Sequence, residues 1–304
     1  MTAASAETQA RVSAFDLFSI AVCALCWGTT WYAITLQFGV VDPIISVTYR
    51  FALAAALIFA WCVLRREPIG LTCTQHLSAL GVGCFTFAID YAFVYWAEQR
   101  VASAVVAVVF ASMAFINLIV FRIAFAQRAS LVAWAAAGLG VVGVALLSWG
   151  ELDGVEFGAA PFIGIALTFG GVVGAAIGNA FSWRGEQAGA PLMASTAWAM
   201  LYGAGILTVF ALATGREWAF VFTTPYVLSL LHLAVNGSVI AFLLYYSLAR
   251  RRGYATASYV SALTPPIAML MSSLFEAKTW GVLAFAGIVA VLAGQVLLLR
   301  TRKS

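Results

Sequence analysis

The sequence contains few charged residues. Of its 304 residues, 9% are Asp, Glu, Lys or Arg, while 63% are hydrophobic. Soluble domains usually contain about a quarter charged residues. A chain with so little charge cannot cover a surface that faces water on all sides, and the loops between its apolar runs are too short for a soluble domain. These properties exclude a soluble globular protein and favour a protein embedded in a lipid bilayer.

Residue types that carry out catalysis are also scarce. The chain has two histidines, His76 and His232, far apart in sequence, and it has neither an H-E-x-x-H motif nor a phosphate-binding P-loop. An enzyme within the membrane would need a clustered nucleophile and base, or a set of metal ligands. We therefore expect no enzymatic activity, no cofactor, no metal site and no direct use of ATP. A structural or receptor role stays open, although no motif supports it.

Cysteine is present but does not predict a disulfide. Four of the five cysteines lie in the apolar runs described below, and none lies in a loop expected outside the cell. Cys23 and Cys26 have the C-x-x-C spacing of redox and metal sites. Inside an apolar helix, and without a second such pair, we interpret them as small packing residues.

The sequence is rich instead in long apolar runs. A transmembrane helix needs about 20 apolar residues, and ten runs meet that length. Acidic Glu7 precedes the first run, acidic Asp16 opens it, and no small-residue cleavage site follows it, so we interpret it as a retained helix. The predicted fold class is an all-α membrane protein with ten transmembrane helices, at residues 16–37, 43–64, 76–96, 101–122, 131–149, 161–182, 191–213, 226–248, 254–275 and 280–299.

Lys and Arg are distributed unevenly between the two sides of the membrane. Only Arg100, Arg216 and Lys278 belong to the side opposite the N-terminus, and Arg50 lies within a span. Because positive residues accumulate in cytoplasmic loops, both termini are expected in the cytoplasm of a bacterial inner membrane protein. A nucleic-acid partner is not expected, since the basic residues do not gather on one face. The residues on the N-terminal side are Arg11, Arg65, Arg66, Arg122, Arg128, Arg184, Arg250, Arg251, Arg252, Arg300, Arg302 and Lys303.

Two stretches about 150 residues apart share a pattern. Ala102-Ser103-Ala104 opens the fourth span as Ala255-Thr256-Ala257 opens the ninth, and Ala137-Gly138-Leu139 matches Ala286-Gly287-Ile288. A unit of five crossings ends on the opposite side from its start, so a second copy is inverted, as in many transporters. We expect a first repeat at 16–149, an outer linker at 150–160, a second repeat at 161–299, and cytoplasmic tails at 1–15 and 300–304. Chance similarity between helices rich in Ala, Gly and Leu is the alternative.

Several motifs together resemble a known family. The first span contains Ala24-Leu25-Cys26-Trp27-Gly28-Thr29-Thr30-Trp31, followed by Pro43 and by Arg50-Phe51; the ninth contains Pro265-Pro266, with Glu276 just beyond. Over residues 17–299 the chain resembles the drug/metabolite transporter superfamily, in its ten-helix branch with the EamA repeat, and is most similar there to the YddG-type exporters. It departs from the family pattern in the fourth span, where Ser112 and Ala126 stand roughly in place of a proline and a trailing glutamate. In the sixth span Gly178-Asn179-Ala180 stands where the Trp-Gly of the first span would be expected to recur, which argues against a strictly symmetric site.

The resemblance implies a function. The expected protein exports small metabolites, chiefly aromatic and other neutral amino acids, by alternating access around a central cavity. Its partners are then a small-molecule substrate and the lipid bilayer, and a functional monomer is left open. The alternative within the superfamily is an exporter of multiple drugs or cationic compounds, because a carboxylate and aromatic faces suffice to bind a cation.

Two charged residues lie within the expected spans, where ionisable groups are costly and often functional. Arg50 in the second span and Asp90 in the third are expected at similar depth. One interpretation is that they form an ion pair with each other, which braces the outer end of the helix bundle. The other is contact with the carboxylate and amino groups of a zwitterion, because the planar guanidinium donates two parallel hydrogen bonds.

Other polar and aromatic residues complete the candidate site. His232 and Asn236 are one helical turn apart and share a face; His232 is either a satisfied interior group or a proton carrier. Pro265 and Pro266 are expected to break the ninth span and free the carbonyls of Ser261 and Ala262, which would line a cavity or only shape a kink. The remaining candidates, lining the cavity or packing within the bundle, are Trp27, Thr30, Trp31, Tyr91, Tyr95, Tyr202 and Tyr259.

The charge distribution makes a direct prediction about topology. In a cysteine-free background, Ser5→Cys and Ser304→Cys should react with a membrane-impermeant thiol reagent only after the membrane is disrupted. Gly154→Cys, in the expected outer linker, should react in intact cells. Labelling of only one chain end in intact cells would exclude an even number of crossings.

Overall fold

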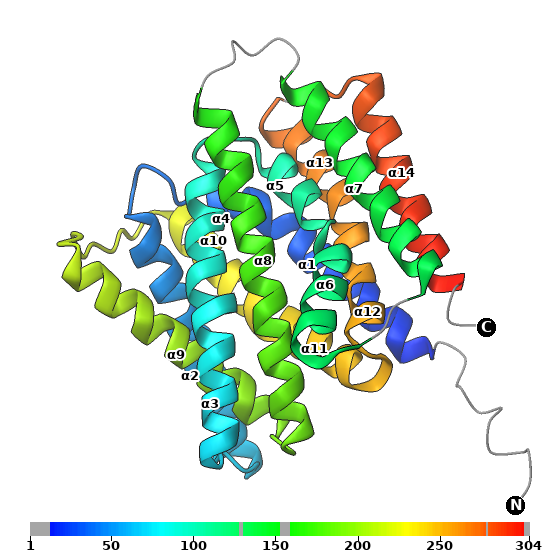
Figure 1. Cartoon of the computed structure of the whole chain (residues 1–304). Helices are drawn as coiled ribbons and strands as arrows, with labels where there is room; N and C mark the ends of the chain where they lie inside the picture. Colours follow the sequence, from blue (N-terminus) through cyan, green and yellow to red (C-terminus); the bar gives the residue numbers. More distant parts are fainter. Residues whose placement is uncertain (1–12, 128–129, 153–158, 278, 301–304) are drawn as a thin grey trace, which may run out of the picture.

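The computed structural model describes residues 13–127, 130–152, 159–277 and 279–300, which form helices joined by short connections (Figure 1). In the first half of the chain these are α1 (Ala14–Thr35), α2 (Pro43–Arg65), α3 (Cys73–Val82), the π-helix η2 (Gly83–Asp90), α4 (Tyr91–Glu98), α5 (Ser103–Phe110), α6 (Met113–Phe125) and α7 (Leu131–Leu152). In the second half they are α8 (Ala159–Gln187), α9 (Leu192–Ala213), α10 (Thr224–Ala234), the π-helix η3 (Val235–Ile240), α11 (Ala241–Arg252), α12 (Tyr254–Ala257), α13 (Tyr259–Phe275) and α14 (Val282–Arg300).

The apolar runs of the sequence correspond to these helices. Within the described residues, six helical stretches are long and apolar enough to cross a membrane, and a seventh is added if α5 and α6, bent by 40°, form one span. The three remaining predicted spans coincide with α7, with α12 and α13, and with α14. The predicted all-helical membrane fold is confirmed.

The same packing occurs twice, with the two halves exchanged. Helix α1 packs against α13 of the other half, as α8 packs against α5 and α6. Helices α2 and α9, which hold equivalent places in the two halves, pack against each other, and so do α7 and α14, which lie side by side along one edge of the molecule (Figure 1). The third span of each half also contains a π-helical turn, η2 in one and η3 in the other. These shared features show a structural duplication.

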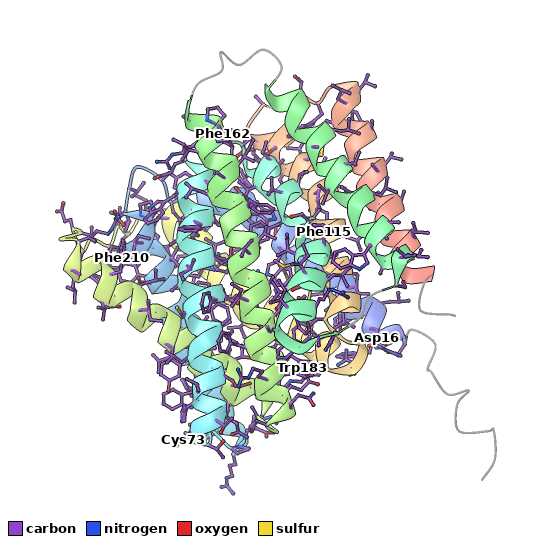
Figure 2. All side chains as sticks on the ribbon, viewed as in Figure 1. Asp16, Cys73, Phe115, Phe162, Trp183 and Phe210 are labelled. Atoms are coloured by element: carbon purple, nitrogen blue, oxygen red, sulfur yellow. The ribbon has the colours of Figure 1, made fainter. Side chains whose placement is uncertain are left out.

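The two halves run in opposite directions through the molecule. Figure 2 shows Asp16, at the start of α1, in the lower half together with Cys73 and Trp183, whereas Phe162, at the start of α8, lies at the top. The first helix of one half therefore begins where the first helix of the other half ends. We call these two sides the Asp16 end and the Phe162 end.

Charged contacts stabilise the Asp16 end. Ser13 caps α1 and exchanges hydrogen bonds with Asp16 in a capping box. The buried carboxylate of Asp16 also pairs with Arg251 at 3.1 Å and with Arg252 at 2.6 Å. These pairs attach the start of α1 to the end of α11, across the two halves.

The structure corrects the expected break in the ninth span. Pro265 and Pro266 lie inside α13, which continues through both, and the interruption falls at Ser258 between α12 and α13. Pro265 cannot donate to the carbonyl of Ser261, but the Thr264 hydroxyl donates to that carbonyl instead, at 2.9 Å. A neighbouring side chain thus replaces the donor that is missing at Pro265.

The cysteines agree with the sequence analysis. All five are free. The Cys23 thiol is buried and contacts the carbonyl of Ala241 at 3.3 Å, so it contributes to packing between α1 and α11.

Glycines determine how closely α7 and α14 approach. A Cβ atom on Gly143 would lie 2.5 Å from the Gly287 carbonyl oxygen, and one on Gly294 would lie 2.5 Å from that of Ala136. Gly138, on the same helix as Gly143, has no such neighbour within 4 Å. Close backbone approach is the usual means of association between helices in lipid.

This contact predicts different effects for two identical substitutions. Gly143→Ala should destabilise the protein by about 1–3 kcal/mol, because the new methyl group overpacks the α7–α14 contact. Gly138→Ala should leave the stability unchanged or raise it slightly, since alanine favours a helix. Thermal unfolding of both variants in detergent tests the prediction; equal midpoints would show that the contact is not tightly packed.

Candidate functional site

A cavity lies at the centre of the molecule, between the two halves. About 660 Å³ of space is not filled by protein atoms, including space open to solvent. Its walls come from α1, α2, η2, α4, α5, α6, α8, α11 and α13, and the lining residues are Trp27, Thr30, Trp31, Ile34, Arg50, Thr86, Asp90, Tyr91, Phe110, Met113, Ala175, Asn179, Phe242, Tyr245, Ser261 and Thr264.

Aromatic rings form much of the wall. The ring of Trp27 lies 5.2 Å from that of Phe242 and 5.3 Å from that of Tyr245, between centroids. One turn along α1, Trp31 contacts Phe110 at 5.0 Å, and its indole Nε1 is buried without a hydrogen-bond partner. A buried indole N–H normally finds an acceptor. The cavity therefore offers flat apolar faces and at least one unused donor.

The π-helical turn η3 provides an acceptor at the cavity wall. In a regular α-helix the N–H of Ala241 would donate to the carbonyl of Gly237, but here it donates to those of Asn236 and Ser238. The Gly237 carbonyl accepts instead from Nε1 of Trp27 at 3.1 Å and from Nη2 of Arg50 at 3.4 Å. One backbone carbonyl thus connects α1, α2 and η3.

The guanidinium of Arg50 is completely buried, with 0% of the residue exposed. Its Nε donates to the Ser238 hydroxyl at 2.9 Å and its Nη2 to the Tyr91 hydroxyl at 3.4 Å. The guanidinium carbon lies 4.5 Å from the centre of the Tyr91 ring, which adds a cation–π contact. The remaining nitrogen, Nη1, has no partner. Arg50 is held firmly and still has a donor to offer.

Asp90, at the end of η2, also lines the cavity and is only 3% exposed. Its Oδ1 has no hydrogen-bond partner. The carboxylate fits against Gly171 of α8, where a Cβ atom would lie 2.9 Å from Oδ1. Arg50 and Asp90 do not form an ion pair in this structure, so the mutual brace is not present in this conformation. Both charges belong to the same cavity, and each has an unused atom.

Polar residues that the sequence analysis missed form another part of the lining. Asn179 of α8 donates to Asn117 at 3.2 Å and to the Tyr245 hydroxyl at 3.1 Å. Thr86 is buried with its hydroxyl unpartnered. Sequence signals existed for both, because Thr86 lies one turn before Asp90 and Asn179 is a polar residue within an apolar span.

The structure places six of the predicted site residues on the cavity, namely Trp27, Thr30, Trp31, Arg50, Asp90 and Tyr91. The others that the structure describes do not line it. Tyr95 donates to Gln37, and Pro265 lies within α13. Tyr202 shares a hydrogen bond of 2.9 Å with His76, between the Tyr hydroxyl and Nδ1. The side chain of Tyr259 is outside the described part of the structure.

His232 and Asn236 form a short hydrogen-bonded chain beside the cavity. Nδ1 of His232 lies 2.9 Å from the amide nitrogen of Asn236, and its Nε2 lies 3.0 Å from the Thr29 hydroxyl. The two residues therefore share a helix face, as their spacing predicted. Both ring nitrogens have partners within the protein, which fits a satisfied interior group.

Fold and site together define a class of protein. An all-helical membrane protein built from two inverted halves, with a polar and aromatic cavity between them, has the architecture of a solute transporter. Residues 15–149 and 162–300 each match the EamA-like transporter family, so the chain belongs to this family of transporters, which is not a family of enzymes. The superfamily suggested by the sequence motifs is confirmed.

Known proteins are similar over most of the chain. The uncharacterised inner membrane transporter YedA of Escherichia coli K12 is 27% identical over 280 residues, 88% of each chain. The protein PecM of Dickeya dadantii is 24% identical over 278 residues, covering 89% of this chain and 88% of its own. The protein PagO of Salmonella typhimurium is 30% identical over 123 residues, 40% of this chain and 39% of its own. A protein of known crystal structure matches with a TM-score of 0.72 at 17% identity, over 94% of this chain and 98% of that one, which supports the fold alone.

The unsatisfied carboxylate of Asp90 predicts a gain in stability on its removal. Asp90→Asn should stabilise the protein by about 1–3 kcal/mol, because it removes a buried charge that lacks a full set of partners. Asp16→Asn is the matched control and should have the opposite effect, since the carboxylate of Asp16 is paired with two arginines. Thermal unfolding of both variants measures this difference. A loss of stability in Asp90→Asn would mean that Asp90 has a structural partner after all.

Proposed function

We propose that this protein exports small amphipathic metabolites, chiefly aromatic and other neutral amino acids, across the bacterial inner membrane by alternating access. The observation that supports this most directly is the pair of opposite charges in the cavity. Arg50 and Asp90 are not paired with each other, and each has a buried atom without a partner. A zwitterion carries the two charges that complement them.

The chemistry of the cavity fits an amino acid. The α-carboxylate would accept a hydrogen bond from Nη1 of Arg50, and the α-ammonium group would donate to Oδ1 of Asp90. An aromatic or other apolar side chain would then lie against the rings of Trp27, Trp31 and Phe242. The YddG-type exporters that the sequence motifs resemble carry the same substrate class, so that resemblance is part of this proposal. The relative YedA, named as an inner membrane transporter, supports the location.

The inverted halves support alternating access as the mechanism. Two halves of the same fold that run in opposite directions can exchange their conformations, so that a cavity between them opens first to one side and then to the other. We propose that the halves comprise 16–149 and 161–299, joined by an outer linker at 150–160. The tails at 1–15 and 300–304 would extend from the same side.

The distribution of positive charge supports one orientation. Arg65, Arg66 and Arg184 lie at helix ends on the Asp16 end, together with the cluster of Arg250, Arg251 and Arg252. Since cytoplasmic segments carry the excess of Lys and Arg, the Asp16 end would face the cytoplasm and the Phe162 end the outside. Both termini would then be cytoplasmic.

An exporter of cationic drugs is the second candidate. Asp90 and the aromatic wall would suit a lipophilic cation. The buried charge of Arg50 in the same cavity opposes it, because a cation there would meet an uncompensated positive group. Uptake of labelled phenylalanine, threonine and a lipophilic cation into proteoliposomes distinguishes the two, and the absence of flux for every amino acid tested would exclude the amino-acid proposal.

The role of Arg50 predicts a large effect of a conservative change. Arg50→Lys should reduce amino-acid transport at least tenfold, because the three donors of an ammonium group lie on one nitrogen and cannot span Ser238, Gly237 and a substrate carboxylate as the planar guanidinium does. A lost hydrogen bond to a charged group, about 1.5–3 kcal/mol, corresponds to about tenfold or more. Arg65→Lys, at an exposed position near the helix end, serves as the control. Undiminished transport by the Arg50 variant would remove this residue from substrate binding.

The role of Trp27 predicts a change in selectivity. Trp27→Ala should reduce phenylalanine transport more than threonine transport, since only the aromatic substrate uses the ring face. Trp61→Ala, at a half-exposed position of α2, should change neither. Competition between the two amino acids in proteoliposomes measures the ratio, and equal losses would instead indicate that Trp27 serves packing.

A further inference from the structure

A second acidic site lies away from the cavity, toward the Phe162 end. Glu98 ends α4, eight residues after Asp90, which is about 12 Å along the helix. The chain that follows it contacts the start of α8, where a Cβ atom on Gly164 would lie 2.9 Å from Val101. Glu98 is only 6% exposed, and neither of its carboxylate oxygens has a hydrogen-bond partner. The transport site described above does not use it.

We propose that Glu98 binds a proton from the outer solution, and that this proton must be bound for the outer end of the transporter to close. The step is a transfer of one proton from water to a carboxylate oxygen of Glu98, and no other bond changes. The proposal uses the outward orientation of the Phe162 end, but it does not depend on which substrate the protein carries.

The surroundings of Glu98 do not compensate a negative charge. Burial disfavours the charged form of Glu98 most, the charge of Glu276 repels it, and the charge of Arg50 attracts it. No hydrogen bond joins Arg50 to Glu98, because neither carboxylate oxygen of Glu98 has a partner. A buried carboxylate without a partner is unfavourable, and taking up a proton removes the charge.

Two arginines lie near the outer end of α4, but neither contacts the Glu98 carboxylate: Arg100 donates to the Trp96 carbonyl, and Arg216 pairs with Asp42. On α4 and η2 themselves, the ionisable neighbours are Tyr95 and Asp90, and the Tyr95 hydroxyl is directed to Gln37 beyond the end of α1. The outer half of α8 contains no ionisable side chain. The described residues contain no group of three His, Cys, Asp or Glu side chains that could hold a metal ion. A proton is the ligand that one isolated carboxyl group can hold.

The site connects the two halves, which is why its protonation would follow opening and closing. Glu276, just past α13 of the second half, accepts hydrogen bonds from Ser272 and from Ser103, at the start of α5 in the first half, the latter at 2.9 Å. The two serine hydroxyls are also 3.0 Å apart. Separating α5 from α13 would break these bonds and hydrate the region around Glu98. Water stabilises the ionised carboxylate, so opening favours release of the proton and closing requires its return.

Infrared spectroscopy tests the protonation directly. The Asp90→Asn protein, which lacks the other buried carboxyl group with an unpartnered oxygen, should show the carbonyl absorption of a buried carboxylic acid in lipid at neutral pH. In this background Glu98→Gln should lose the band, whereas Glu217→Gln, which changes an exposed glutamate in the outer loop after α9, should keep it. The band should be the same in sodium chloride and choline chloride. Three results would overturn the proposal: no band before Glu98 is changed, a band that persists in Glu98→Gln, or a band that is lost when sodium chloride replaces choline chloride.

Transport measurements test the consequence. In proteoliposomes, lowering the external pH should accelerate turnover of the wild type and of Glu217→Gln. Glu98→Gln should run at the acid rate at every external pH, because the amide resembles the protonated carboxyl. A pH dependence retained in this variant would overturn the proposal. If the wild type carries no amino acid but the infrared band of Glu98 is present, the proposed substrate fails and the protonation site stands.

A second variant covers the case in which Glu98→Gln does not fold. Glu276→Gln removes the neighbouring carboxyl and leaves Glu98 in place. The infrared band should remain, since it belongs to Glu98. Its loss would assign the proton to Glu276 and overturn the role given to Glu98.

Discussion

The carbonyl of Gly237 is the contact on which the central site depends. It is available because the π-helical turn η3 directs the N–H of Ala241 to other carbonyls. The freed oxygen accepts from Trp27 and from Arg50, and so it positions an aromatic wall and a buried charge together. Only glycine fits there, since a Cβ atom would lie 2.4 Å from Thr30. One local irregularity in a helix thus joins parts of α1, α2 and η3 beside the cavity.

The duplicated fold supplies a symmetric scaffold for an asymmetric site. Both halves contain a π-helical turn in the third span, but η2 ends at the acidic Asp90, whereas η3 supplies an acceptor that holds the basic Arg50. The scaffold pairs α7–α14 and α2–α9 preserve the two-fold relation between the halves. The cavity does not, because Trp27 and Trp31 on α1 have no tryptophan counterparts among the lining residues from α8. With the acidic Asp90 and the basic Arg50 both on the cavity between the inverted halves, the site suits a substrate whose two ends differ in charge.

Much of the fold and part of the site could be predicted before the structure was known. The apolar runs correspond to helices because a span of lipid requires a continuous apolar helix. Arg50, Asp90 and Trp27 stood out because charged and amphipathic groups are rare inside spans. Glu98 was missed because the predicted span ended at residue 96, two residues before it, and Tyr202 was included although its partner is His76 rather than the cavity. Helix ends and side-chain partners depend on neighbouring helices, which periodicity alone does not specify.

The sequence by itself determined the class of fold, the duplication and the residues with unusual chemistry, because these follow from hydropathy, composition and spacing. Only the tertiary structure decided how those residues are used. It separated Arg50 from Asp90 by giving Arg50 other acceptors, supplied the Thr264 hydroxyl where Pro265 lacks a donor in α13, and left Glu98 without a partner. Each outcome depends on where a helix from elsewhere in the chain places a donor or an acceptor. Inside the membrane, where water cannot replace a missing partner, that placement decides which polar groups are satisfied and which remain available.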